Sequence, residues 1–195
     1  MKKILIVASL AAFASCNSSN DNKAKVESMG PSGDSSSAST STATSTTMAD
    51  INSPYAVTYS SKFAMGDAKN AEAILTLWKD WDNGDLAAHK DLFADSVELH
   101  FYNGTMLHAS RDSVVAAAQK VRSSFATSVS SVDAVTALRS TDKNENWALV
   151  WGKEIDTDKK GKVDSFYLQE TWGFNKDGKT DKLYQFRAAA KPPKK

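Results

Sequence analysis

The pattern of apolar and polar positions divides the chain into a short apolar run, a long polar stretch and a patterned remainder. Residues 4–13 are almost all apolar, whereas residues 17–53 are mostly Ser, Thr, Asn, Asp and Gly. A stretch with so few large apolar side chains cannot bury enough surface to offset the entropy lost on ordering. We therefore expect a disordered Ser/Thr-rich tether over residues 16–53, one folded domain over 54–190 and a basic tail over 191–195.

Three helices are predicted at the start of the domain. The first covers residues 68–81, because its apolar residues recur every three or four positions, with Asp67 as its N-cap and Gly84 at its end. A short second helix is expected over residues 86–93, after Asp85. A third is expected after Ser110, with a buried stripe made of Val114, Ala118, Val121 and Phe125.

A hairpin precedes the third helix, and longer strands follow it. Residues 96–101 alternate between apolar and polar side chains, and Asn103-Gly104 predicts a hairpin with a two-residue turn before residues 105–109. Alternation and turn residues predict four longer strands, at about residues 128–139, 147–156, 163–174 and 183–188. Helices placed before a mostly antiparallel sheet indicate an α+β fold.

The stretch DNGDLAAHKDLFADSVELHFYNG, residues 82–104, together with this element order, resembles the nuclear transport factor 2-like superfamily. That superfamily includes ketosteroid isomerase and SnoaL-like polyketide cyclases. The resemblance, over residues 70–189, implies a cone-shaped, cystatin-like α+β barrel, in which a strongly curved sheet wraps around the N-terminal helices. It also implies a pocket at one end of the cone and a homodimer through the sheet. Members of the superfamily include enzymes, ligand binders and interaction modules, so the fold does not name an activity.

The isomerase mechanism does not fit this chain. It needs a carboxylate base, a tyrosine and a protonated acid, and these three roles align with Phe101, Leu77 and Glu170. Phe101 cannot accept a proton, so the required base is missing. Alternation along residues 168–174 points Glu170 inward, where burial should raise its pKa and where an indole N–H or a tyrosine hydroxyl is the expected partner.

An aromatic-lined pocket in the cone is the main site prediction, since all five tryptophans lie in the domain. Its expected lining is Leu77, Trp78, Trp81, Leu99, Phe101, His108, Trp151, Glu170 and Trp172. The alternative interpretation is that these aromatic residues simply fill the core. His108 and Glu170 are weak candidates for catalytic residues. With a two-residue turn, His108 pairs with Leu99 and points inward while His100 points away, so no metal site and no cofactor are expected.

Cys16 is the chain's single cysteine, and its surroundings predict a location. Lys2 and Lys3, the apolar run and Ala14-Ser15 before Cys16 resemble a bacterial lipoprotein signal peptide over residues 1–15, cut before a lipidated Cys16. The alternative is ordinary secretion after Ala12-Phe13-Ala14. Charge adds one exclusion, because 24 basic and 23 acidic residues give a near-neutral chain that is unsuited to nucleic acid.

These patterns lead to an expected function. The chain is expected to be a lipid-anchored protein of the bacterial cell envelope, periplasmic or surface-facing, that binds a small apolar ligand without catalysis. The alternatives are a SnoaL-like acid-base enzyme acting on a hydrophobic substrate and a dimeric interaction module with a filled core.

Overall fold

A computed structural model of the chain describes residues 51–190. The expected signal peptide, Cys16, nearly all of the tether and the basic tail lie outside the described residues. Within the described part, α1 covers Ala68–Asn83 and begins and ends as predicted. The Asp67 carboxylate accepts a hydrogen bond from the Lys69 N–H at 2.9 Å, and Gly84 closes the helix in the left-handed conformation at φ 75°.

The predicted helix over residues 86–93 is wrong. The chain forms turns there and then a single 3₁₀ turn, η1, at Lys90–Leu92. The Lys90 and Leu92 N–H groups donate to carbonyl groups three residues back, at 3.3 and 3.0 Å. The cost of nucleating a helix is too large for so short a segment, whose last residue, Phe93, already begins the next strand.

The third predicted helix is α2, Arg111–Arg122, and it begins after Ser110 as expected. Its buried face differs from the prediction, because Val114 and Val115 are buried while Val121 is 54% exposed. Arg122 is buried instead, and its guanidinium donates hydrogen bonds to the Trp81 and Asp82 carbonyl oxygens at 2.6 and 2.9 Å. These carbonyl groups lie in the last turn of α1, where the regular helix hydrogen bonds end, and the arginine supplements the bond that the Trp81 carbonyl accepts from the Gly84 N–H at 3.0 Å.

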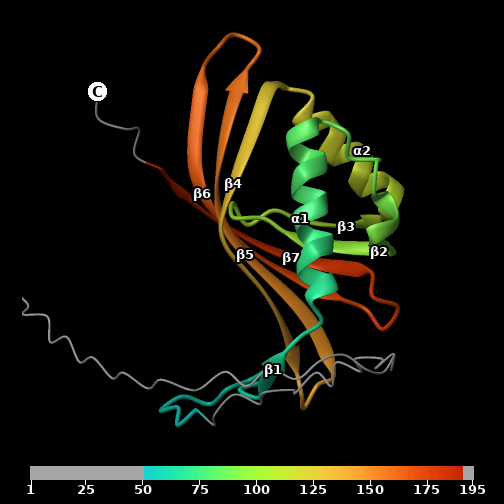
Figure 1. Ribbon diagram of the computed structural model, residues 1–195, viewed down its shortest axis with the longest axis vertical. Coiled ribbons are helices and arrows are strands. Elements are labelled where there is room, and N and C mark those ends of the chain that lie inside the picture. Colours follow the sequence, from blue (N-terminus) through green and yellow to red (C-terminus); the bar gives the residue numbers. More distant parts are fainter. Residues whose placement is uncertain (1–50, 191–195) are drawn as a thin grey trace, which may run out of the picture. The chain divides into compact units, whose positions relative to one another are not determined.

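Within residues 51–190, seven strands form one sheet. They are β1 Phe63–Met65, β2 Phe93–His100, β3 Met106–Ser110, β4 Phe125–Ser140, β5 Glu145–Asp158, β6 Val163–Phe174 and β7 Thr180–Ala189. Their spatial order is β1-β4-β5-β6-β7-β2-β3, and every neighbouring pair is antiparallel except β2 with β7. The strongly bent sheet carries both helices on one side, with α1 packed on β4 and β5 and α2 near β2 and β3 (Figure 1). The predicted α+β class and the four long strands are confirmed.

The β2–β3 hairpin is shifted by one residue from the predicted register. Leu99 pairs with Leu107, so His108 pairs with Glu98 rather than with Leu99. The Phe101 N–H donates to the Thr105 carbonyl at 2.9 Å, which leaves a three-residue loop ending at Gly104 with φ 81°. His108 is consequently exposed and lies outside the core, with Nε2 3.0 Å from the Ser96 hydroxyl.

The two faces of β5 are the reverse of what the aromatic pattern indicated. Ala148 and Val150 are buried under the helices, while Trp147 and Trp151 lie on the outer face, and Trp151 is 37% exposed. Gly152 explains part of this choice. A β-carbon there would lie 2.9 Å from the Trp78 ring and 2.3 Å from the Ser131 carbonyl oxygen, so the inner face has room only for glycine.

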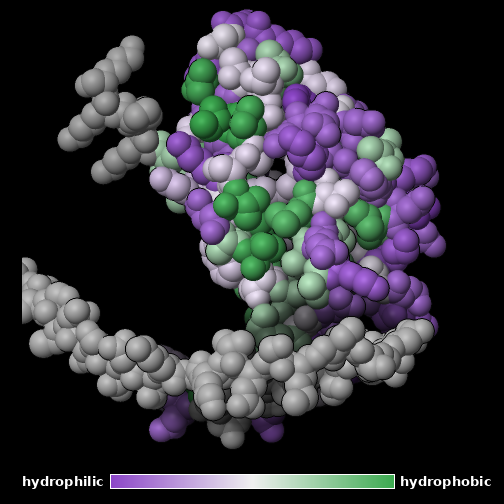
Figure 2. Space-filling view, in the orientation of Figure 1, coloured by the Kyte–Doolittle hydropathy of each residue, from purple (hydrophilic) through white to green (hydrophobic). Residues whose placement is uncertain are grey.

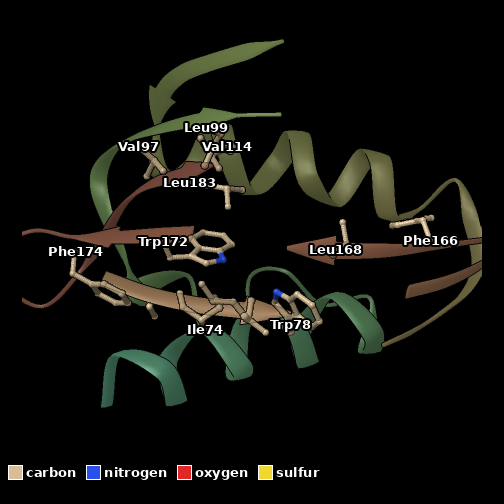
Figure 3. Packing of buried hydrophobic residues seen from close by; sticks show 13 residues of the cluster. Ile74, Trp78, Val97, Leu99, Val114, Phe166, Leu168, Trp172, Phe174 and Leu183 are labelled. Carbon is tan, nitrogen blue, oxygen red and sulfur yellow. The ribbon is translucent and has the colours of Figure 1, made fainter. Parts of the chain in front are cut away.

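The core lies between α1 and the concave side of the sheet. Figure 3 shows Trp78 from α1 and Trp172 from β6 facing the same interior space, with Ile74 and Leu183 packed nearby. Ile74 is fully buried and Trp78 is 8% exposed. The large aromatic side chains therefore fill the interior of the cone.

Candidate functional site

The predicted pocket is occupied by the protein's own side chains. Five of its nine residues, Leu77, Trp78, Leu99, Glu170 and Trp172, are between 5% and 8% exposed. Four of these, all except Glu170, belong to the hydrophobic core cluster. The structure thus brings these residues together, as predicted, but as packed neighbours around one another.

The other four predicted residues lie at or beyond the edge of that core. Trp81 and Phe101 are half-buried. His108 and Trp151 point away from the interior, for the reasons of register and face described above. The interpretation of these two as pocket residues is therefore wrong.

Glu170 points inward as alternation predicted. Its Oε2 accepts hydrogen bonds from the indole N–H groups of Trp78 and Trp172 at 2.7 and 2.9 Å, and its Oε1 accepts one from the Gln185 amide at 2.9 Å. Burial raises the pKa of Glu170, and these three hydrogen bonds partly oppose the rise. With both oxygens engaged by neighbouring side chains, this carboxyl group holds α1 to the sheet.

A second group of buried acids was missed from the sequence. Glu154 and Asp156 on β5 are 7% and 4% exposed. The Trp81 indole N–H donates to Glu154 Oε1 at 3.1 Å and to the Ser128 hydroxyl at 2.8 Å, and that hydroxyl donates to Asp156 Oδ1 at 2.7 Å. Both acids occupy the same strand face as Val150, so the correct assignment of the two faces would have revealed them.

The two acids share an environment that favours a bound proton. Burial, followed by the nearby charge of Asp156, raises the pKa of Glu154 to about 8. A carboxyl group with such a pKa can release or accept a proton near neutral pH. This pair is therefore the group in the interior best suited to acid-base chemistry.

The three histidines lie in separate places. His89 Nδ1 lies 3.0 Å from both carboxylate oxygens of Asp80, and His100 contacts Glu98 through a hydrogen bond. Among residues 51–190, no cluster of three or more His, Cys, Asp or Glu side chains is arranged to hold a metal ion. In the same part of the chain, no helix is long and apolar enough to cross a membrane.

A hollow of about 510 Å³ opens on the outer face of the sheet, and we call it the outer hollow. Its lining is largely apolar: Tyr59, Phe63, Leu138, Glu145, Trp147, Leu149, Thr171, Lys182 and Tyr184. The ring of Trp147 meets Tyr59 edge-on, with 5.9 Å between ring centroids, and lies nearly parallel to Tyr184, with 6.5 Å between centroids. None of these residues was among those predicted, although placing Trp147 on the outer face would have indicated the site.

Hydrogen bonds fix the aromatic wall of the outer hollow. The Trp147 indole N–H donates to the Tyr59 hydroxyl at 3.0 Å, and that hydroxyl donates to Glu145 Oε2 at 2.5 Å. Partial burial and the hydrogen bond to Glu145 raise the pKa of Tyr59. The orientation of the Trp147 ring is therefore set before any ligand arrives.

A second hollow of about 850 Å³, the end hollow, adjoins the outer hollow at the start of α1. The two hollows share Glu145, Trp147 and Lys182. The rest of the end hollow is mainly polar, with Asn144, Asn146 and others around the strand turns. Neither hollow contains a residue of the predicted pocket, although Phe174, which lines the end hollow, is a member of the core cluster.

No protein-family model and no curated protein sequence matches the chain. Solved structures do match. An LEH-like epoxide hydrolase from M. tuberculosis is 7% identical, with a TM-score of 0.52, and covers 62% of this chain and 84% of its own. An uncharacterized cystatin-fold protein from Novosphingobium aromaticivorans is 12% identical, with a TM-score of 0.50, and covers 60% of this chain and 97% of its own.

An NTF2-like protein of unknown function from Burkholderia pseudomallei is 17% identical, with a TM-score of 0.49, and covers 61% of this chain and 90% of its own. Identities this low show the fold alone. The described domain has the nuclear transport factor 2-like fold, as the sequence resemblance predicted.

Proposed function

From this nuclear transport factor 2-like fold, we propose that the chain is a lipid-anchored protein of the bacterial envelope that binds a small molecule with an apolar face, without catalysing a reaction. The observation that carries the proposal is the outer hollow with its fixed aromatic wall. The packed interior supports the same assignment, because both oxygens of Glu170 are engaged by neighbouring side chains and the core around it is filled. The ligand-binding site that we propose therefore lies on the outer side of the sheet, whereas the sequence predicted it on the concave side.

The outer hollow has the properties of a small-molecule site. Its volume of about 510 Å³ falls within the range of such sites, and its lining combines aromatic rings with a few polar groups. Rings held in place by hydrogen bonds lose little entropy when a ligand packs against them. An apolar ligand face against Trp147 and Tyr184 would also remove their exposed carbon surface from water.

A dye titration of the intact chain tests this site. We expect 8-anilinonaphthalene-1-sulfonate, a flat apolar anion, to bind saturably with a rise in its fluorescence. The Trp147→Ala variant should weaken binding at least tenfold, whereas Trp151→Ala should leave it unchanged. Trp151 is a matched control, because it lies on the same strand and face four positions away. Equal binding by all three proteins, or no saturable binding by the wild type, would contradict the proposal.

Anchoring through Cys16 is the second part of the proposal. It rests on the basic, apolar and small residues that precede the cysteine and on the polar stretch that follows it. A diacylglycerol with a further acyl chain would give stable attachment, since two chains bind a bilayer far more firmly than one. The expected place is the periplasm or the cell surface, and secretion without a lipid is the alternative outcome.

Metabolic labelling distinguishes these outcomes. In a bacterium fed a palmitate analogue, we expect label on the wild-type chain and its recovery with membranes. Cys16→Ala should abolish both. An unlabelled wild-type chain in the medium would indicate ordinary secretion and contradict the anchor.

An acid-base enzyme is the alternative function, and one observation favours it. The raised pKa of Glu154 beside Asp156 supplies a proton donor near neutral pH, whereas the earlier candidates do not, because His108 is exposed and Glu170 is fully engaged. The similar M. tuberculosis protein is described as an epoxide hydrolase. Hydrolysis of lipophilic epoxides by the intact chain, abolished by Glu154→Gln, would support this alternative over non-catalytic binding.

We further propose a homodimer through the outer sheet face beyond the hollow. Three large side chains there are exposed: Trp151 at 37%, Tyr167 at 51% and Phe186 at 56%. Strand pairing places Phe186 and Trp151 on either side of Gln169, so they form one patch. Figure 2 shows further hydrophobic surface over the strands beside α1.

Analytical ultracentrifugation tests the homodimer. The wild-type chain should sediment as a dimer, and Phe186→Asp should sediment as a monomer, because it places a charge in the apolar patch. A wild-type chain that sediments as a monomer at 100 µM would contradict the homodimer.

A further inference from the structure

The two hollows together carry information about the chemistry of the ligand. They meet at Trp147, which is half-buried and has one apolar hollow and one polar hollow beside it. A ligand that extends from one hollow to the other needs an apolar face for the ring of Trp147 and polar groups along its edge. A purely apolar ligand would strip water from Glu145 and Lys182 without replacing their hydrogen bonds.

The charges around the end hollow indicate a neutral ligand. Its lining includes three basic and three acidic side chains: Arg139, Lys176, Lys182, Asp67, Glu145 and Asp181. Such a balance gives no net attraction for phosphate or another anion, and none for a cation. The lining holds both donors and acceptors, which suits a ligand whose groups can both donate and accept.

Hydroxyl groups have that property, since each offers one donor and two acceptor lone pairs. Within the described residues, Glu145 Oε1 has no hydrogen-bond partner, while Oε2 is engaged by Tyr59. The amide groups of Asn146 and Asn144 and the Lys182 ammonium add further donors and acceptors around the same space. A molecule that carries several hydroxyl groups around an apolar ring face would satisfy both sides of Trp147.

We propose that the outer hollow and the end hollow bind a neutral carbohydrate chain, with the C–H face of one sugar ring stacked on Trp147 and its hydroxyl groups hydrogen-bonded to Glu145 and Lys182. Pyranose rings combine an apolar face with a polar edge, as the two hollows require. The ring of Tyr184 is inclined by 28° to that of Trp147, with 6.5 Å between centroids, and is stacked on His100 at 4.8 Å, so it stands beside Trp147 as a second aromatic surface. The inference rests on the proposed function, because it names the ligand class of the same site.

The test is a titration of the intact chain with four neutral hexasaccharides, of β-1,4-glucose, α-1,4-glucose, β-1,3-glucose and β-1,4-N-acetylglucosamine units. Tryptophan fluorescence and calorimetry report binding. At least one hexasaccharide should bind saturably, and its matching monosaccharide should bind at least tenfold more weakly. Trp147→Ala should weaken binding at least tenfold, Glu145→Gln several-fold, and Trp151→Ala should have no effect.

Each outcome has a definite meaning. If the dye binds at Trp147 but none of the four sugars binds at 5 mM, the carbohydrate assignment is overturned and the proposed apolar binding site remains. If neither binds, both proposals fail. Sugar binding that survives Trp147→Ala also overturns the assignment, provided that the variant unfolds at the wild-type temperature and therefore keeps its fold.

Discussion

Glu170 shows how one buried carboxyl group can hold a helix to a sheet. It accepts hydrogen bonds from an indole on α1, an indole on β6 and an amide on β7, and it lies fully inside the core. A buried donor that loses its acceptor keeps the cost of having left water. Three donors bind this one side chain, so its loss leaves an unpaired donor on each of α1, β6 and β7.

We predict that Glu170→Leu lowers the free energy of unfolding by about 1–3 kcal/mol, because both indole N–H groups lose their acceptor. Urea unfolding followed by circular dichroism measures the change. Glu170→Gln is the control, since it keeps the side-chain volume and one acceptor oxygen and should cost less. A leucine variant as stable as the wild type would show that the three hydrogen bonds contribute nothing net.

Glu154 should make stability depend on pH. Its pKa is raised from 4.5 to about 8 in the folded state, so between these values the folded protein holds a proton that the unfolded chain has released. Stability must therefore fall as pH rises from about 4.5 to about 8. We predict a higher melting temperature at pH 5 than at pH 8 and a smaller difference in Glu154→Gln. A difference of the same size in the variant would assign the effect to another group.

The direction of single side chains could be predicted only where one strand face is plainly polar. Along β6, alternation around Glu170 gave the correct face. Along β5, both faces carry apolar residues. The predicted pocket puts the large Trp151 inside, whereas the small Ala148 and Gly152 lie there. The Trp78 ring packs so closely against Gly152 that this face of β5 must be the one that points inward. Trp78 lies on a helix about seventy positions earlier in the sequence, so the strand's own pattern does not reveal this contact.

At the scale of elements, α2 secures the end of α1 through Arg122 and through Gln119, whose amide donates to the Gly84 carbonyl at 3.0 Å. The Arg122 guanidinium donates to the Trp81 and Asp82 carbonyl groups and, at 3.4 Å, to the Phe125 carbonyl. The C-terminal carbonyl groups of α1 carry partial negative charge, which a cation stabilises. The two helices are thereby joined although they share few apolar contacts.

We predict that Arg122→Met destabilises the protein by about 1–3 kcal/mol, because it keeps much of the side-chain volume but removes every donor. Amide exchange should show the largest gain in opening in the last turn of α1. Arg122→Lys keeps the charge but has fewer donors, so its stability should lie between those of the wild type and Arg122→Met. Unchanged exchange in α1 would mean that the helix end does not rely on the arginine.

Element boundaries followed from local chemistry more reliably than element pairing did. Asp67 and Gly84 fixed both ends of α1, because caps are local features. The Asn103-Gly104 pair predicted a hairpin correctly but is compatible with two-residue and three-residue loops, so the register shifted and His108 turned outward. The short β1 was not predicted, since its three residues are stabilised only by pairing with β4.

For the molecule as a whole, the fold provides two surfaces that could bind a ligand, and the packing separates them. The concave side is filled by α1, its tryptophans and the Glu170 network, while the outer side keeps a half-buried aromatic wall. The class of fold was predictable because element order and periodicity determine it. The location of the proposed ligand-binding site was not, because it depends on which side chains the interior has room to accept.

Hydrogen–deuterium exchange of the intact chain with and without saturating 8-anilinonaphthalene-1-sulfonate tests the location of this site most directly. The account predicts slower exchange on binding in residues 145–149 of β5 and residues 182–184 of β7, around the outer hollow. No change is expected in residues 74–81 of α1 or 166–168 of β6, which contribute core side chains and do not line the outer hollow. Slower exchange confined to those core segments, with the outer hollow unaffected, would contradict the account and return the ligand to the interior of the cone.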